Sequence, residues 1–182
     1  MLSFDRTWSA WLDGLTDERP FWGGLATFCA RWLLLLFFGA AVLALTRYAE
    51  FGPLTAILLI FTLGLAYLLT LAIAYAVRRK RPYEVSADAA HIKPWIYTPS
   101  FPSSHAMAAF VIATILVFEF PLPLWGIICL YLVSTIIAIS RVVVGVHYLT
   151  DVIAGALVGL SINALIIWSN QVQHFIGKLL GL

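Results

Sequence analysis

The segment LTAILLIFTLGLAYLLTLAIAYAV, residues 54–77, contains no charged side chain. As a helix it is long enough to cross the ~30 Å hydrocarbon core of a lipid bilayer. Its small or easily satisfied residues, Thr62, Gly64 and Thr70, allow neighbouring helices to pack closely in a membrane. The segment therefore predicts a transmembrane helix.

The composition of the whole chain agrees with this prediction. Of its 182 residues, 62% are hydrophobic and 11% are charged, and the mean hydropathy is +0.96. A soluble domain has about 45–50% apolar and about 25% charged residues, so the composition excludes an ordinary soluble domain and a disordered chain. We predict an all-α integral membrane bundle, a single domain over residues 1–182 with about five spans of ~20 residues.

Four other apolar segments flank residues 54–77. They cover residues 22–46, 103–118, 124–140 and about 147–168. Arg31 falls inside the first of them, and a charge at that depth is costly unless it faces a polar cavity or reaches the surface. Either this span starts later, near Trp32, or Arg31 faces something polar, and the sequence leaves both alternatives open.

The N-terminal segment, residues 1–19, is amphipathic. Its aromatic residues and leucines recur at helical spacing on one face, and charged residues lie off that face. Two tryptophans on the apolar face, Trp8 and Trp11, favour a helix that lies in the headgroup zone of the membrane. The alternative is a helix that packs against the bundle.

The longest polar segment is residues 78–102. It opens with the basic run Arg78–Arg81 and contains several prolines, so it cannot form one regular helix. A loop of this length in a compact protein is usually functional. A basic run beside a span binds anionic lipid or phosphate headgroups more often than nucleic acid. We therefore expect an active-site loop, a lipid phosphate as partner and no nucleic-acid partner.

Alternating spans bring polar side chains together at one membrane face. The second span ends where the third begins, and the fourth ends where the fifth begins, on the same side. The residues that gather there are Arg81, Ser103, Ser104, His105, Arg141, His147 and Asp151. The opposite face offers little beyond Arg47, Glu50 and Glu119.

Two arginines and a helix start predict an anion site within this cluster. The guanidinium groups of Arg81 and Arg141 match phosphate oxygens bidentately. Ser103 and Ser104 lie where the third span begins, and the unpaired N–H groups of a helix N-terminus attract anions. Together these groups predict a cradle for a substrate phosphate.

Two histidines and an aspartate predict chemistry at that anion. His147 and Asp151 are four residues apart, so on a helix Asp151 can orient one imidazole nitrogen while the other attacks. His105 can then act as the general acid and base. A zinc site made of the same three residues is the alternative, but neighbouring arginines repel a cation. We therefore expect no metal and no cofactor.

A non-catalytic phospholipid-binding or transport protein is an alternative from another class. A transporter carries polar residues through the middle of several spans. The second to fifth spans are nearly devoid of such residues here, and the polar groups gather at one end. The pattern favours an enzyme that takes a lipid headgroup from the bilayer.

These motifs resemble those of the type 2 phosphatidic acid phosphatases. The family's third motif, Ser-Arg-x5-His-x3-Asp, is matched in full over residues 140–151. The second motif, Pro-Ser-Gly-His, is matched over residues 102–105, with Ser104 in place of glycine. The first motif, Lys-x6-Arg-Pro, is matched only at Arg81-Pro82, and Ala74 occupies the position of the lysine.

The resemblance, which covers about residues 54–168, implies a metal-independent membrane phosphatase. It implies that His147 is the nucleophile that forms a phosphohistidine, that Asp151 orients it, and that His105 is the general acid. The phosphate-binding groups that it implies are Arg81, Ser103, Arg141 and backbone N–H groups near Ser104. The absence of the lysine at Ala74 removes one phosphate contact, and the sequence does not show what replaces it.

Within this family the chain looks most similar to the small bacterial undecaprenyl-diphosphate phosphatases of the bacitracin-resistance type. These carry a Phe-Pro-Ser-x-His segment like residues 101–105. The similarity implies hydrolysis of undecaprenyl diphosphate to undecaprenyl phosphate, which recycles the lipid carrier of the cell wall. Alternatives are a phosphatase acting on phosphatidylglycerophosphate, phosphatidic acid or lipid A phosphates, and a phosphotransferase with an acceptor other than water.

The same similarity implies a multi-pass protein of the bacterial inner membrane, with its site facing the periplasm or the cell exterior. More Lys and Arg residues lie on the motif side than on the other, and the positive-inside rule would place that side in the cytoplasm. Basic residues retained for the substrate distort this count, so we expect the outward orientation.

Overall fold

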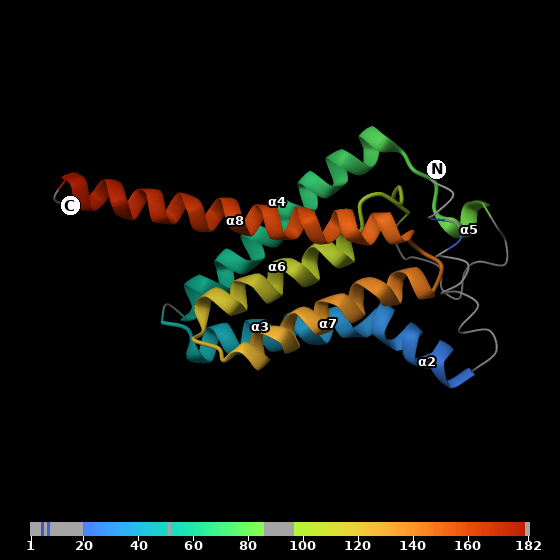
Figure 1. Cartoon of the computed structure of the whole chain (residues 1–182), viewed down its shortest axis with the longest axis horizontal. Helices are drawn as coiled ribbons and strands as arrows, with labels where there is room; N and C mark the ends of the chain where they lie inside the picture. Colours follow the sequence, from blue (N-terminus) through green and yellow to red (C-terminus); the bar gives the residue numbers. More distant parts are fainter. Residues whose placement is uncertain (1–4, 6, 8–19, 51, 86–96, 181–182) are drawn as a thin grey trace.

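The computed structural model describes residues 5, 7, 20–50, 52–85 and 97–180, and for residues 20, 52 and 166–180 it describes the backbone path alone. Within this part of the chain every regular element is a helix, as predicted (Figure 1). The interfacial helix predicted within residues 1–19 lies outside the described residues, except for Asp5 and Thr7. So does the middle of the predicted active-site loop, residues 86–96.

The first span consists of three consecutive helical segments. They are α2 (Pro20–Phe28), the π-helix η1 (Cys29–Leu33) and α3 (Leu34–Tyr48). Together they form one apolar helical stretch, Phe21–Tyr48, that is long enough to cross a membrane. The helix therefore begins before Trp32 and carries Arg31 within it.

Arg31 lies within the π-helix η1, and its side chain is exposed on the molecular surface. The adjacent residue, Ala30, is buried at 1% exposure. A π-turn shifts the hydrogen-bonding pattern of a helix by one residue, and such turns are frequent at functional sites. Here it is the buried side of the turn that reaches toward the candidate site, as described below.

The other helices match the predicted spans closely. They are α4 (Gly52–Val77), the short α5 (Pro82–Val85), α6 (Ser104–Glu119), α7 (Leu124–Val143) and α8 (Leu149–Leu180). The largest difference is in α8, which begins after His147 and continues beyond the predicted end near Trp168. Its extension gives the molecule its long C-terminal projection (Figure 1).

Three stretches in the described chain are long and apolar enough to span a membrane. They are Phe21–Tyr48, Pro53–Val85 and Leu124–Val143. Two shorter apolar helical stretches, Ser104–Glu119 and Leu149–Leu165, accompany them. Helix α6 contacts α3, α4, α7 and α8, so it is the central helix of the bundle.

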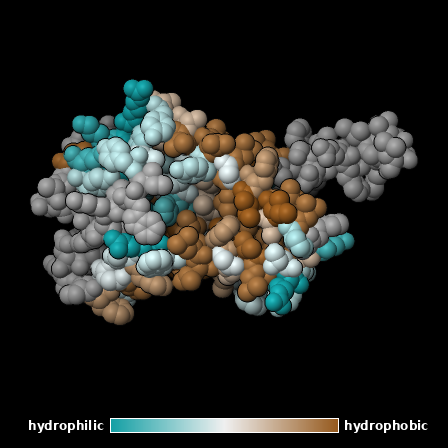
Figure 2. Space-filling model, turned by 180° about the vertical axis from the view of Figure 1, so that it is seen from behind, coloured by the Kyte–Doolittle hydropathy of each residue, from teal (hydrophilic) through white to brown (hydrophobic). Residues whose placement is uncertain are grey.

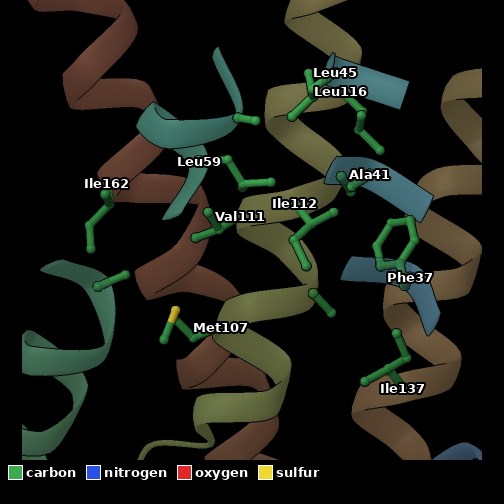
Figure 3. Close-up of a cluster of buried hydrophobic side chains, with 14 residues drawn as sticks. Phe37, Ala41, Leu45, Leu59, Met107, Val111, Ile112, Leu116, Ile137 and Ile162 are labelled. Atoms are coloured by element: carbon green, nitrogen blue, oxygen red, sulfur yellow. The ribbon is translucent and has the colours of Figure 1, made fainter. Parts of the chain in front are cut away.

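The buried core lies where these helices meet around α6. Val111, Ile112 and Leu116 project from α6 into a cluster with side chains from α3, α4, α7 and α8 (Figure 3). The outer surface is apolar as well, since Phe61, Leu68 and Trp125 are 67%, 62% and 70% exposed. Figure 2 shows a broad hydrophobic band, with most hydrophilic residues toward one end and a smaller group toward the other. This distribution suits a protein whose solvent is lipid.

Two glycines bring α8 into direct contact with α6. A Cβ atom built on Gly155 would lie 2.2 Å from the backbone oxygen of Ser103, and one on Gly159 would lie 2.6 Å from that of Met107. Both positions therefore require glycine, which is the small-xxx-small pattern of membrane helix pairs. The contact fixes the start of α8 beside the start of α6, where the backbone N–H of Ser103 donates to the backbone carbonyl oxygen of Asp151 at 2.9 Å.

Candidate active site

The predicted site residues come from chain segments that meet at one end of the bundle (Figure 1). Arg81 precedes α5, His105 lies in the first turn of α6, and Arg141 lies in the last turn of α7. His147 lies in the connection between α7 and α8, and Asp151 lies in the first turn of α8. The connection turns sharply at Gly145, whose φ of 72° favours glycine.

A narrow pocket opens among these segments. Its lining includes Arg81, Ser104 and His147 from the predicted set. Helix α4 contributes Thr70 and Ala74 to the same pocket. Ala74 therefore faces the site, which is notable because it occupies the position of the lysine in the resembled motif.

His147 is almost fully buried, at 2% exposure. Its Nδ1 atom lies 2.8 Å from the carbonyl oxygen of Ser100. A carbonyl can only accept, so we assign the proton to Nδ1, which leaves Nε2 with a lone pair that can accept from Arg81. Nε2 lies 3.4 Å from the Nη1 atom of Arg81.

The electrostatic environment keeps this imidazole neutral. Burial, reinforced by the positive charges of Arg81 and Arg141, lowers the pKa of His147 to about 4, although Asp151 acts in the opposite direction. A neutral imidazole with an available Nε2 lone pair is the form that can attack an electrophile. The structure thus places a neutral imidazole beside a guanidinium group.

The expected geometry of His147 and Asp151 on one helix face is wrong in detail. Helix α8 begins at Leu149, so His147 precedes the helix rather than belonging to it. The Asp151 Oδ2 atom approaches His147 Nδ1 only to 3.6 Å, which is too long for a hydrogen bond. Asp151 instead accepts from the backbone N–H of Tyr148 at 2.9 Å, as in one half of a capping box.

Ser100 supplies the connection between the two residues. Its hydroxyl group donates to Asp151 Oδ2, and its carbonyl oxygen accepts from His147 Nδ1. Its own N–H donates to the carbonyl oxygen of Arg79 at 2.8 Å, and its side chain is fully buried. Ser100 therefore orients the imidazole directly and the carboxylate at the same time, a role that the sequence analysis missed.

Arg81 is held in place by backbone and side-chain acceptors. It is 5% exposed, and its Nε atom donates to the carbonyl oxygen of Thr98 at 2.8 Å. Its Nη2 atom donates to the Thr98 hydroxyl group at 3.0 Å, and Nη1 donates to the carbonyl oxygen of Val146 at 3.1 Å. These contacts fix the guanidinium group beside His147 before any substrate binds.

Arg141 is equally buried, at 5% exposure, but it is incompletely satisfied. Its Nη1 atom donates to the carbonyl oxygen of Ala30 in the π-helix at 2.6 Å. Its Nε atom has no hydrogen-bond partner among the described residues. An unpaired buried N–H of a guanidinium group is costly, so Arg141 is suited to receive an anionic oxygen.

The two serines at the start of α6, Ser103 and Ser104, have different surroundings. Ser103 is fully buried and is the N-cap residue, whose hydroxyl group accepts from the N–H of Ala106 at 3.5 Å. Ser104 lines the pocket and Ser103 does not, so the expectation of a direct phosphate contact fits Ser104 better. The free N–H groups of this helix start add donors and a favourable dipole.

His105 and Arg79 also lie at the end of the bundle that holds the candidate site. His105 is half-buried in the first turn of α6, within electrostatic range of Arg141, His147 and Arg81. Arg79 donates from Nη1 to Asp151 Oδ1 at 2.6 Å. Both Asp151 oxygens are thereby engaged, which argues against the zinc alternative.

Comparison with known proteins agrees with this arrangement. The model of the PAP2 superfamily matches residues 55–175. A curated relative from Sulfolobus acidocaldarius, named undecaprenyl-diphosphatase, is 36% identical over 121 residues, and the match covers 59% of this chain and 57% of that relative.

Two solved structures share the fold. The crystal structure of Aquifex aeolicus LpxE matches with a TM-score of 0.74 and 22% identity, over 90% of this chain and 94% of that chain. A PAP2-type phosphatidylglycerolphosphate phosphatase from Bacillus subtilis matches with a TM-score of 0.70 and 22% identity, over 93% and 88% of the two chains. Since the family model matches more than half of the chain, the motif-bearing helices included, the chain belongs to the PAP2 superfamily.

Proposed function

We propose that this protein is a membrane-embedded lipid phosphatase that hydrolyses undecaprenyl diphosphate to undecaprenyl phosphate through a phosphohistidine at His147. The observation that carries the proposal is the buried, neutral imidazole of His147. Its Nδ1 atom is held by the Ser100 carbonyl oxygen, and its Nε2 atom is turned toward Arg81.

In the first step the Nε2 lone pair attacks the terminal phosphorus. The bond between phosphorus and the bridging oxygen breaks, and His105 gives a proton to the leaving lipid phosphate. Arg81 and Arg141 bind the oxygens of the transferring phosphoryl group, on which charge is spread in the transition state. The Nε atom of Arg141 gains the acceptor that it otherwise lacks.

The second step returns the enzyme to its resting state. His105 takes a proton from a water molecule, the water oxygen attacks phosphorus, and the bond from phosphorus to Nε2 breaks to release phosphate. While the imidazole carries the phosphoryl group it gains positive charge, which the Ser100 carbonyl oxygen and the Asp151 carboxylate stabilise from the Nδ1 side. No metal ion takes part in either step.

The choice of substrate rests on the curated relative, which is named undecaprenyl-diphosphatase. A second candidate substrate is phosphatidylglycerophosphate, because the Bacillus subtilis protein with the same fold is a phosphatidylglycerolphosphate phosphatase. Phosphatidic acid and lipid A phosphates are further candidates of the same chemistry. All of them present a phosphate at the membrane surface, next to a site that lies at one end of an apolar bundle (Figure 2).

We also propose that the protein lies in the plasma membrane with its site at the outer face. The basic residues of the site end would favour the opposite orientation if all of them were free topology signals. Arg79, Arg81 and Arg141 are bound into the site through Asp151, Thr98 and Ala30, so they are retained for reasons other than topology.

Phosphate release from undecaprenyl diphosphate in detergent, with excess EDTA, tests the proposed function. We expect release by the wild type and none by His147→Ala, with both proteins folded. Release by both would refute the assignment of His147. No release by either, followed by release from another member of a lipid phosphate panel, would replace the substrate; binding of these lipids without any release would favour the non-catalytic alternative.

A further inference from the structure

The basic run after α4 contains a second arginine, besides Arg81, that is bound into the site. Arg79 is only 18% exposed at its side chain, and it lies between two buried carboxylates. Its Nη1 atom is 2.6 Å from Asp151 Oδ1, and its Nη2 atom is 2.5 Å from Asp5 Oδ2. Asp5 and Asp151 are 1% and 0% exposed, so neither carboxylate is compensated by solvent.

Tyr148 and Thr150 also hold this arginine, and Thr150 is itself bound to Asp5. Its guanidinium carbon lies 4.2 Å from the centroid of the Tyr148 ring, which is a cation–π contact. Nη1 also donates to the hydroxyl oxygen of Thr150 at 2.7 Å. The hydroxyl group of Thr150 in turn donates to Asp5 Oδ2 at 2.7 Å, and its backbone N–H donates to Asp5 Oδ1 at 3.1 Å.

These contacts form a chain that ends at the nucleophile. Asp5 binds Arg79, Arg79 binds one oxygen of Asp151, and the other Asp151 oxygen accepts from Ser100, whose carbonyl oxygen holds Nδ1 of His147. Asp151 thus depends on Arg79 for charge compensation and on Ser100 for orientation. Asp5, far away in the sequence, shares the same guanidinium group and limits how far it can move toward Asp151.

We propose that Asp5 and Arg79 are positioning residues that hold the Asp151 carboxylate, and through Ser100 the imidazole of His147, in the reactive arrangement. The proposal rests on the proposed function, in which His147 is the nucleophile. It assigns a role in the site to Asp5 and separates Arg79 from the residues that bind the substrate phosphate. Loss of Asp5 frees Arg79 to pair more closely with Asp151 and to displace it from Ser100.

The steady-state kinetics of Asp5→Asn and Arg79→Gln provide the first test. We expect kcat to fall about tenfold in Asp5→Asn and about a hundredfold in Arg79→Gln, with KM within about twofold of wild type, because the reacting groups and not the phosphate contacts are misplaced. The double variant should be no slower than Arg79→Gln alone, since the two residues act in one chain. If KM rose more than kcat fell in Arg79→Gln, Arg79 would be a phosphate ligand and the proposal would be overturned.

Matched variants separate positioning from general damage. Arg78→Gln removes a neighbouring positive charge. The Arg78 side chain is exposed, and within the described part of the chain its hydrogen-bond partner is the Tyr75 carbonyl oxygen, so kcat should remain unchanged. Thr150→Ser keeps the bridging hydroxyl group and should retain most of the wild-type kcat. Thr150→Val removes it and should resemble Asp5→Asn. Equal rates in the two Thr150 variants would contradict the proposal.

Nitrogen NMR of histidine-labelled protein in detergent gives a readout that needs no turnover. The His147 signals are identified by their loss in His147→Gln. We expect the Nδ1–H tautomer in the wild type and altered His147 shifts in Asp5→Asn and Arg79→Gln, but not in Arg78→Gln. If the wild type hydrolyses no lipid phosphate while these shifts change, the proposed function fails and the positioning chain stands. Unchanged shifts in both variants would refute the chain, whatever the activity.

Discussion

The close contact between α8 and α6 yields a sharp prediction for Gly155→Ala. A Cβ atom at this position would lie 2.2 Å from the backbone oxygen of Ser103, 3.1 Å from its carbonyl carbon and 3.2 Å from the Cβ atom of Ala106. The clashing atom belongs to a buried helix N-cap and cannot rotate away. The start of α8 must therefore retreat from α6 by about 1 Å to restore ordinary van der Waals contact.

This retreat carries Asp151 with it, because Asp151 lies one turn before Gly155 on the same helix. The hydrogen bond from the Ser103 N–H to the backbone carbonyl oxygen of Asp151 lengthens, and the Asp151 carboxylate moves relative to Ser100 and His147. Overpacking of this kind costs about 1–3 kcal/mol of stability. A displacement of about 1 Å in a catalytic arrangement costs about a hundredfold in rate.

Thermal unfolding in detergent and phosphate release measure the two effects. Gly64→Ala is the matched control, since a Cβ atom at Gly64 in α4 meets nothing within 4 Å. We expect Gly155→Ala to have a lower Tm and a kcat reduced about a hundredfold, and Gly64→Ala to behave as wild type. Wild-type Tm and kcat in Gly155→Ala would show that α8 does not fix Asp151 through this contact.

Three further predictions concern the pocket and the nucleophile. Ala74→Lys should lower KM about threefold to tenfold, because Ala74 lines the pocket and an ammonium group there can bind phosphate; it should also lower the Tm, because Ala74 is only 3% exposed and the longer side chain overpacks its surroundings; an unchanged KM in the folded variant would show that the ammonium group does not reach the phosphate. Ser100→Ala should reduce kcat about tenfold with unchanged KM, since it removes the hydroxyl donor to Asp151 but keeps the carbonyl oxygen for His147; an unchanged kcat would show that this donor is dispensable. Because the pKa of His147 is lowered from 6.5 to about 4, the unfolded chain binds this proton more readily, so folding stability should fall as the pH falls from 6.5 to 4, by about 3 kcal/mol in total. The free energy of unfolding, measured with denaturant, should show this loss in the wild type and lack it in His147→Gln. If the free energies of the two proteins changed with pH in parallel, the pKa of His147 would not be lowered.

The sequence was sufficient to predict the helices because apolar run length fixes membrane spans. Leu54–Val77 differs from α4 by two residues at its start, and the spans that became α6 and α7 were placed similarly well. The surroundings of Arg31 could not be predicted, because only the backbone shows that the helix continues through a π-turn with this side chain on the surface. The glycine pair at 155 and 159 was visible in the sequence and could have predicted the α6–α8 contact.

The candidate site was predicted as a set of side chains but not as a network. Arg81, Ser104 and His147 line one pocket, as the alternation of spans suggested. Ser100 was missed because it acts partly through its backbone carbonyl oxygen, which any residue possesses, and because it lies in a loop without periodicity. Arg79 was not separated from its basic neighbours, since its partners Asp5 and Asp151 become neighbours only in the folded chain.

The central claim is that His147 is phosphorylated during turnover. A rapid acid-free quench of wild type with undecaprenyl diphosphate labelled at its terminal phosphate tests this claim most directly, followed by mapping of the labelled peptide. The account predicts an acid-labile, base-stable phosphate on His147 that appears and decays at rates compatible with kcat, and none in His147→Ala. Turnover with the label on another residue would contradict the account. Turnover without any covalent label, under conditions in which the intermediate forms faster than it is hydrolysed, would contradict it as well.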